Sequence, residues 1–305
     1  MIEIDSIPRP LLLDGGLATE LETQGFELKD QLWSARLLMD SPEAISDAHL
    51  AYLRAGAGCI ISASYQASAS GFMSLGLQVE EAEALIRSSI ALARDAIDRF
   101  CLETSPLIQP LVAASIGPYG AYLADGSEYR GDYRVGQQTL RDFHRPRMAE
   151  LIKAGPDLLA CETIPCLMEA SVLSELLMEF AAPAWISFSC RDDKHLSSGE
   201  AIRDAALLYR DNPHVFALGV NCSSPSHVES LILEIKKHWS KRIVVYPNSG
   251  EHYDATSGGW HGTTSPVSCA SAAAGWQQSG ADIIGGCCRM GPTHVQAIGQ
   301  ALTQR

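Results

Sequence analysis

Apolar and polar positions follow a repeating plan along the chain: a short, almost uninterrupted apolar run, then a longer stretch with the apolar spacing of an amphipathic helix. The apolar runs predict strands at residues 11–13, 59–63, 107–116, 158–161, 184–189, 215–220, 243–246 and 282–284. The amphipathic stretches predict helices at residues 42–55, 79–102, 137–154, 166–180, 200–209, 226–239, 266–279 and 292–302. Uninterrupted apolar strands are typical of a parallel sheet that is buried on both faces.

Eight strand–helix units in 305 residues predict a single (β/α)8 barrel that occupies residues 1–305 as one domain. The alternative is a doubly wound open sheet. The first strand is followed by the segment Asp14-Gly15-Gly16-Leu17-Ala18-Thr19, which lacks the G-x-G-x-x-G spacing of a dinucleotide-binding open sheet. The barrel is therefore favoured, and the polar segment 119–136 is expected to be a loop over its mouth.

Charge and composition exclude several functions. The chain has 23 Lys and Arg against 36 Asp and Glu, a formal net charge of −13, which argues against nucleic-acid binding and against anionic membrane surfaces. No run approaches the ~18 apolar residues of a membrane span, and the first ten residues contain no apolar signal-peptide core. We therefore expect a cytoplasmic protein whose nine cysteines stay mostly reduced.

In a (β/α)8 barrel the active site lies at the carboxyl ends of the strands. The polar residues at these ends are Asp14, Ser62, Ser64, Ser115, Cys161, Glu162, Thr163, Cys190, Asn221, Cys222, Asn248, Cys287 and Cys288. They include no Lys or His, one of which an aldolase or hydrolase on this barrel would need.

Three cysteines stand out at this rim. Cys222 ends the sixth predicted strand, and Cys287 and Cys288 end the eighth, so their side chains can meet around one ion. Three thiolates with one open position are typical of catalytic zinc, and Gly285-Gly286 allows a close backbone approach. Ordinary packing or a redox-active pair explains the same spacing, so the residues alone leave these alternatives open. The remaining cysteines are expected to pack in the core or on helices, except Cys190, whose role stays undecided.

Two carboxylates at the rim also have alternative explanations. Asp14 precedes two glycines and fits a turn, whereas Glu162 follows an apolar strand and needs a partner such as a substrate amine, a salt bridge or a cap. Several histidines fall on predicted helices, where we expect them at the surface; these are His49, His144, His227, His238 and His294.

Five segments together resemble the homocysteine S-methyltransferase family. They are Asp14-Gly15-Gly16-Leu17-Ala18-Thr19-Glu20-Leu21-Glu22, Ser62-Ala63-Ser64-Tyr65-Gln66-Ala67-Ser68, Gly219-Val220-Asn221-Cys222, Tyr246-Pro247-Asn248-Ser249-Gly250-Glu251 and Gly285-Gly286-Cys287-Cys288-Arg289. The matches extend from near residue 11 to near residue 292, and the combination is far more specific than any one segment.

The resemblance implies a barrel with a catalytic zinc ion held by Cys222, Cys287 and Cys288. The thiolate of homocysteine takes the fourth position during turnover, and Asn248 matches a residue that fills it at rest in related enzymes. Asp14 and Glu162 are implied to hold the amino-acid end of homocysteine, and Asn221 is placed with Asn248 among the substrate-binding residues.

The methyl donor implied by this resemblance is a small sulfonium, S-methylmethionine or S-adenosylmethionine, with the former favoured. The chain has no folate or cobalamin module and lacks the long C-terminal extension of betaine-dependent relatives. Aromatic residues on predicted rim loops are candidates to face the sulfonium by cation–π contact: Tyr65, Tyr119, Tyr122 and Trp260. Alternatives are methylation of selenocysteine or selenohomocysteine, and a non-catalytic barrel that senses zinc or thiols.

Overall fold

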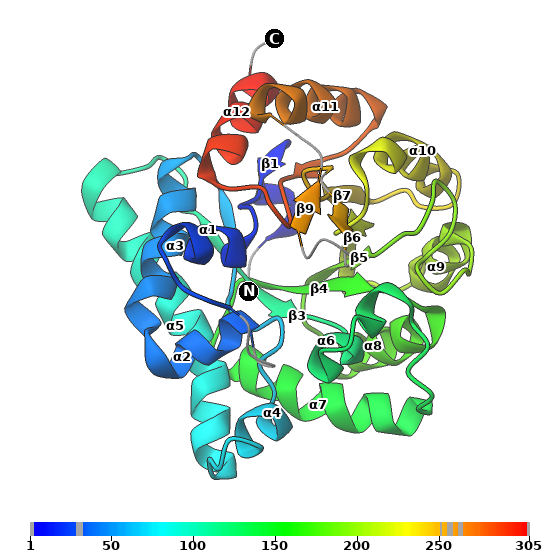
Figure 1. Ribbon diagram of the computed structural model, residues 1–305. Helices are drawn as coiled ribbons and strands as arrows, with labels where there is room; N and C mark the ends of the chain where they lie inside the picture. Colours follow the sequence, from blue (N-terminus) through cyan, green and yellow to red (C-terminus); the bar gives the residue numbers. More distant parts are fainter. Residues whose placement is uncertain (1–2, 29–32, 251, 255–258, 262–264, 304–305) are drawn as a thin grey trace.

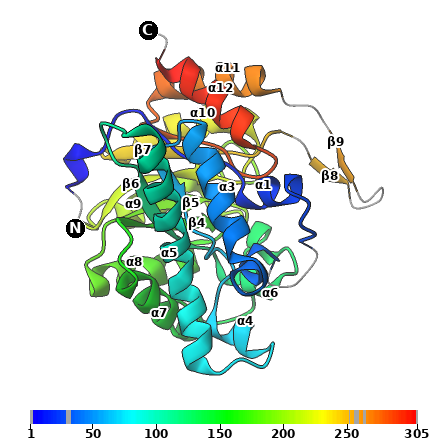
Figure 2. The ribbon, with the colours of Figure 1, turned by 90° about the vertical axis from the view of Figure 1, so that its left-hand side faces the viewer.

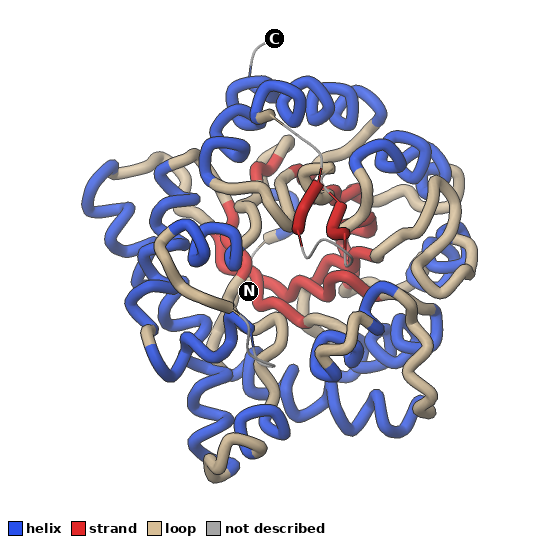
Figure 3. Tube along the Cα trace, viewed as in Figure 1, coloured by secondary structure: helices blue, strands red, loops and turns tan. Residues whose placement is uncertain are grey.

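The strands close into a barrel in the computed structural model, which describes residues 3–28, 33–250, 252–254, 259–261 and 265–303. Eight parallel strands form one sheet: β1 (Leu11–Leu12), β2 (Cys59–Ile61), β3 (Leu111–Ile116), β4 (Leu158–Ile164), β5 (Ala184–Phe188), β6 (Val215–Asn221), β7 (Arg242–Tyr246) and β10 (Ile283–Ile284). Their order is β1-β10-β7-β6-β5-β4-β3-β2, and a parallel bridge between Leu13 and Cys59 joins β1 to β2. The (β/α)8 barrel is thus confirmed and the open sheet is excluded (Figures 1 and 3).

All eight predicted helices are present and surround the strands (Figure 3). They are α3 (Pro42–Arg54), α5 (Val79–Thr104), α7 (Gln137–Lys153), α8 (Leu167–Phe180), α9 (Ile202–Tyr209), α10 (Pro225–Lys236), α11 (Pro266–Ser279) and α12 (Pro292–Thr303). Within the described residues, no helix is long and apolar enough to cross a membrane.

Several short elements were not predicted. They are η1 (Ile4–Ser6), α1 (Leu17–Thr23), η2 (Trp33–Arg36), α2 (Leu37–Asp40), α4 (Ala69–Met73), α6 (Tyr119–Leu123), η3 (Ser127–Tyr129), and the hairpin of β8 (His252–Asp254) and β9 (Gly259–His261). The segment 119–136 is therefore not an irregular loop throughout, because it contains α6 and η3. Figure 2 shows α1, α6 and the hairpin at one end of the barrel and the N-terminus at the other.

Two sequence expectations need correction. β3 begins at Leu111 and not at residue 107, because Leu107 and Ile108 are exposed and Pro110 cannot donate a ladder hydrogen bond. His49 and His144 are fully buried although they lie on helices, so they belong to inward faces. Burial lowers the pKa of His49 to about 4, so this ring is neutral at pH 7.

Two apolar cores hold the barrel together. The inner one fills the space enclosed by the strands and includes Leu13, Trp185 and Tyr246, while Ile7 adds to it from the N-terminal segment. The outer one lies between strands and helices and includes Ile60, Leu173 and Val245. A filled interior means that ligands have access at the rim and not through a pore.

A substitution at Gly219 tests how closely β6 and β7 pack. A Cβ at this position would lie 1.7 Å from the backbone oxygen of Val244 on β7. We predict that Gly219→Ala lowers the free energy of unfolding by about 1–3 kcal/mol, the usual cost of overpacking. Gly275 on α11 is the matched control, since a Cβ there meets no atom within 4 Å. Gly275→Ala should stabilise the protein by about 0.5–1 kcal/mol. Urea denaturation measures both, and equal effects would contradict this packing.

Candidate active site

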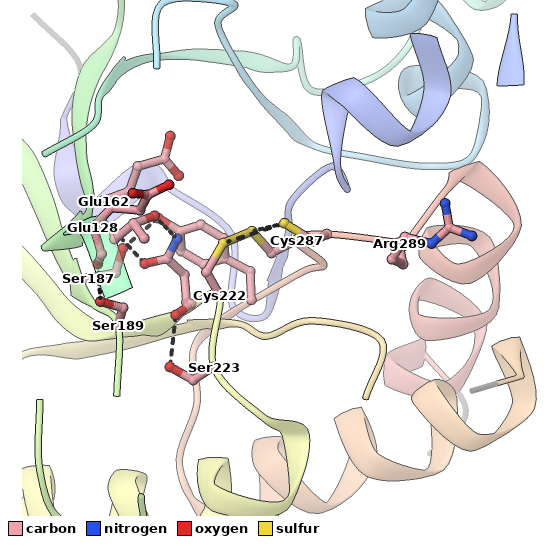
Figure 4. The surroundings of a disulfide bond; sticks show 12 residues. Glu128, Glu162, Ser187, Ser189, Cys222, Ser223, Cys287 and Arg289 are labelled. Carbon is pink, nitrogen blue, oxygen red and sulfur yellow. Dashed lines mark hydrogen bonds between the residues drawn. A yellow bond between two sulfur atoms is a disulfide. The ribbon is translucent and has the colours of Figure 1, made fainter. Parts of the chain in front are cut away.

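Three cysteines converge at the carboxyl ends of β6 and β10. Cys222 directly follows β6, while Cys287 and Cys288 follow β10 after two glycines. Their three Sγ atoms all lie within 4.8 Å of one another. Cys222 and Cys287 are joined by a disulfide, and Cys288 Sγ lies 4.0 Å from each of the other two sulfurs (Figure 4). The structure therefore brings together the cysteines that the sequence singled out.

This cluster fits a tetrahedral metal ion. Sulfur ligands ~2.3 Å from zinc lie roughly 3.8 Å apart, close to the separations of Cys288 Sγ from its two neighbours. Cys222 and Cys287 can serve as thiolate ligands after their disulfide is reduced. Burial raises the pKa of Cys288 to about 11, and a bound cation is what would favour its thiolate form at neutral pH.

The loop that carries Cys287 and Cys288 is held against the start of the chain. A Cβ at Gly285 would lie 2.8 Å from the backbone oxygen of Asp14, so this approach requires glycine. The N–H of Arg289 donates to Thr19 Oγ1 at 3.0 Å, and the N–H of Gly16 donates to the carbonyl of Met290 at 3.0 Å. These contacts explain why the Asp14-Gly15-Gly16 and Gly285-Gly286-Cys287-Cys288 motifs occur together.

Asp14 lies beside this loop and is 2% exposed. Its Oδ2 accepts a hydrogen bond from the N–H of Ile61 at 2.8 Å, whereas its buried Oδ1 has no partner. Burial raises the pKa of Asp14 well above the ordinary value, and the neighbouring negative charge of Glu162 raises it further. A cationic group of a ligand would supply the missing partner.

Glu162 lies in β4 and is 7% exposed. The Ser115 hydroxyl donates to its Oε1, and the Tyr246 hydroxyl is a second hydrogen-bond partner. Burial raises the pKa of Glu162 to about 7, although these hydrogen bonds oppose the shift. Ser115 and Tyr246 were visible at strand ends, but the sequence did not show that both hold this carboxylate.

The two asparagines differ in their surroundings. The side-chain amide of Asn221 forms two hydrogen bonds with Thr163. Asn221 Oδ1 accepts from the Thr163 N–H and Asn221 Nδ2 donates to Thr163 Oγ1, both at 2.7 Å. Thr163 has a φ of 60°, so Asn221 stabilises a strained turn directly after Glu162. This supports a positioning role for Asn221, and its predicted substrate contact stays a prediction. Asn248 has a buried Oδ1 without a partner, and the next residue, Ser249, donates its N–H to the carbonyl of Cys288 at 3.1 Å.

The candidate aromatic residues separate into two groups. Tyr65 lies near Cys288 and Glu162, and its hydroxyl is hydrogen-bonded to Thr163. Tyr119 and Tyr122 pack on Phe143, with ring centroids 5.1 and 5.3 Å from it, which indicates ordinary packing. Trp260 lies on β9, where side chains are outside the described part of the structure. Tyr129, which the sequence did not indicate, forms a hydrogen bond with Cys288.

A buried polar network on α7 and α8 holds the rim loops. Arg147 donates to the carbonyls of Gly117, Ser64 and Tyr65 at 2.9, 2.7 and 2.6 Å. Glu169, fully buried, accepts from the N–H of Tyr119 at 2.6 Å and is also bonded to His144. The loops after β2 and β3 are thereby fixed from beneath.

Comparisons with known proteins agree with this geometry. Residues 11–302 match the family model described as homocysteine S-methyltransferase. The homocysteine S-methyltransferase YbgG of Bacillus subtilis is 50% identical over 299 residues, which cover 97% of this chain and 95% of the relative. The selenocysteine Se-methyltransferase of Brassica oleracea var. italica is 43% identical over 311 residues, 96% of this chain and 89% of the relative.

Solved structures of the Escherichia coli homocysteine methyltransferase MmuM are also similar. Its metallated form has a TM-score of 0.87 and 43% identity, with 97% of each chain covered. Its oxidised form has a TM-score of 0.87 and 46% identity, with 95% of each chain covered.

Fold and site together define a (β/α)8 barrel with a three-cysteine centre able to bind a metal ion. The chain belongs to the homocysteine S-methyltransferase family.

The buried Glu162 makes stability depend on pH. Its folded-state pKa of about 7 exceeds the unfolded value of ~4.3, so its stabilising contribution is complete below pH ~4.3 and is lost as the pH rises through 7. We predict that the free energy of unfolding of the wild type, measured by urea denaturation, declines between pH 5 and pH 8. Glu162→Gln should remove about 3 kcal/mol of this decline. The exposed variant Glu80→Gln should retain that decline, and an unchanged pH dependence in Glu162→Gln would contradict the assignment.

Proposed function

We propose that this protein transfers a methyl group from a small sulfonium donor to the thiolate of L-homocysteine, which forms methionine. One observation carries the proposal: three clustered cysteine sulfurs and two buried carboxylates, Asp14 and Glu162, lie at the same rim of the barrel. A thiol-binding centre and an amine-binding pocket are the two things that homocysteine requires.

Zinc is the metal we propose for this centre, held by Cys222, Cys287 and Cys288. Three thiolates and no imidazole or carboxylate within the described cluster favour zinc over harder cations. When bound, zinc would keep a coordinated substrate sulfur in its nucleophilic thiolate form at neutral pH. Asn248, with its unpartnered Oδ1 beside the Cys288 loop, is the candidate for the remaining ligand position at rest.

The protein's own residues position the acceptor. Asp14 Oδ1 and the Glu162 carboxylate bind the ammonium group of homocysteine, because both are buried acceptors and Asp14 Oδ1 has no partner within the protein. The hydroxyls of Ser115 and Tyr246 hold Glu162 in place, and Asn221 fixes the turn that follows it. A preorganised carboxylate pair lowers the entropic cost of aligning the acceptor sulfur.

The chemical step needs no proton transfer at carbon. The acceptor thiolate attacks the donor methyl group, and the electron pair of the broken carbon–sulfur bond remains on the departing sulfur. Positioning and electrostatics therefore provide most of the rate. This agrees with the absence of Lys and His among the polar residues at the described strand ends.

Selenocysteine is a second candidate acceptor, since the Brassica relative is named for that activity. A selenolate would bind at the same three-cysteine centre, and the amino group of selenocysteine would bind to the same carboxylates.

We further propose that the protein works in a reducing compartment such as the cytoplasm. The disulfide between Cys222 and Cys287 would prevent both residues from binding metal, so it must be reduced there.

Metal content tests the proposed centre. Reduced protein should bind about one zinc ion per chain, as one three-thiolate site implies. Cys288→Ser should lose most of it, while Cys269→Ser on helix α11 should not. Elemental analysis after dialysis measures the ratio, and full zinc retention by Cys288→Ser would contradict the assignment.

Turnover tests the function. Reduced, zinc-loaded protein should form methionine from homocysteine and S-methylmethionine, and Cys288→Ser should lower kcat/KM by at least ~100-fold. A thiol or zinc sensor would bind the metal without turnover with any sulfonium donor. Zinc-loaded wild type that is inactive with S-methylmethionine and S-adenosylmethionine would refute the proposed activity.

A further inference from the structure

One carboxylate at the rim has a buried oxygen without a partner and no place in the binding of the acceptor. Glu128 lies in η3, on the connection between β3 and α7, and its Oε2 is buried without any hydrogen-bond partner. An unpartnered buried carboxylate oxygen is costly, which indicates that a ligand supplies the missing partner.

Glu128 lies near the cysteine centre. The 3-10 helix η3 packs against β4, the strand that carries Glu162. Figure 4 shows Glu128 and Glu162 on the same side of the sulfurs. The negative charge of Glu128 is, after burial, the largest cause of the raised pKa of Tyr65, and the following residue, Tyr129, hydrogen-bonds to Cys288. The carboxylate therefore lies among the groups that surround the reacting sulfur.

The backbone around Glu128 is fixed. The Ser189 hydroxyl donates to the Glu128 carbonyl at 3.1 Å. A Cβ added to Gly120 would lie 2.4 Å from the Glu128 nitrogen, so α6 and η3 are in close contact. A carboxylate held in this way is already oriented before a ligand arrives.

The other charges of this segment neutralise one another. Arg130 pairs with Asp125 at 3.9 Å and with Asp132 at 3.2 Å, and both aspartates are more than half exposed. Burial raises the pKa of Glu128 and the charge of Arg130 lowers it, but among the described residues the ion pairs of Arg130 are with these two aspartates and not with Glu128.

Both substrates of the proposed reaction carry an α-ammonium group. In S-methylmethionine plus homocysteine thiolate, the donor carbon–sulfur bond breaks, its electron pair neutralises the sulfonium, and a new carbon–sulfur bond forms on the acceptor, which gives two molecules of methionine. The two sulfurs and the methyl carbon must be in line, and the site must at the same time hold two α-ammonium groups, one on each amino acid. Asp14 and Glu162 are assigned to the ammonium group of homocysteine, which leaves the ammonium group of the donor to be bound by another acceptor.

We propose that Glu128 binds the α-ammonium group of the methyl donor, an assignment that rests on the proposed function. The ammonium charge persists through the reaction, whereas the sulfonium charge disappears in it. A carboxylate that binds the ammonium contributes equally to the ground state and the transition state, so it controls KM and not kcat. Glu128 thereby selects sulfonium donors that are themselves amino acids.

The test compares wild type and Glu128→Gln with two donors, S-methylmethionine and (3-carboxypropyl)dimethylsulfonium, which lacks the amino group. With S-methylmethionine, Glu128→Gln should raise the donor KM by about 10- to 100-fold, the usual effect of losing a charged hydrogen bond, and leave kcat within about twofold. With the deaminated donor, both proteins should have the same KM. The KM for homocysteine and the zinc content should not change.

Asp125→Asn is the matched control, because it removes one negative charge from the same segment at an exposed position and keeps a side-chain oxygen to accept from the Ser127 N–H. It should leave the donor KM near the wild-type value. Equal losses with both donors, an unchanged donor KM in Glu128→Gln, or a raised homocysteine KM would each overturn the assignment.

Direct binding separates this inference from the proposed function. Equilibrium dialysis with labelled S-methylmethionine should give a weaker dissociation constant for Glu128→Gln than for wild type, whether or not methionine forms. Wild-type protein without turnover refutes the function, whereas active wild type with equal donor binding in both proteins refutes the role of Glu128 alone.

Discussion

The parallel alignment of eight strands is the constraint on which the site depends. Each strand delivers its last residue to the same rim, so Asp14 and Cys288, near opposite ends of the chain, lie in neighbouring segments. The junction of β1 with β10 is the critical contact, because Gly285 packs against the Asp14 backbone. A larger residue there would separate Asp14 from the cysteine centre.

The proposed binding of cations at the rim depends on acceptor oxygens that the protein leaves without partners. Among the described residues, Asp14, Glu128 and Asn248 each have a buried acceptor oxygen without a partner, and so has Gln66. Such oxygens are costly in an empty site and are relieved by ammonium groups or metal ions. Arg147 on α7 and Glu169 on α8 hold the loops after β2 and β3, and the second of these loops leads to Glu128.

Much of this arrangement was predictable from sequence, because it follows from periodicity. The strands and long helices have clear patterns. The site residues Cys222, Cys287, Cys288, Asp14 and Glu162 lie at most four positions after an apolar run. Glu128 and Tyr129 were missed, since a loop has no period that shows which side chain turns inward. The buried His49 and His144 were misassigned because a polar residue on an inward helical face looks like a surface residue. The disulfide between Cys222 and Cys287 also had no signal in the spacing, which fits metal binding and oxidation equally.

The proposed function depends on activation of the homocysteine sulfur by direct coordination at the three-cysteine centre. X-ray absorption at the zinc edge, on reduced and zinc-loaded protein, measures this directly. Without substrate, the spectrum should show three sulfur ligands at ~2.3 Å and one lighter atom. Addition of homocysteine should replace the lighter atom by a fourth sulfur. An unchanged sulfur number in the presence of saturating homocysteine would contradict the account.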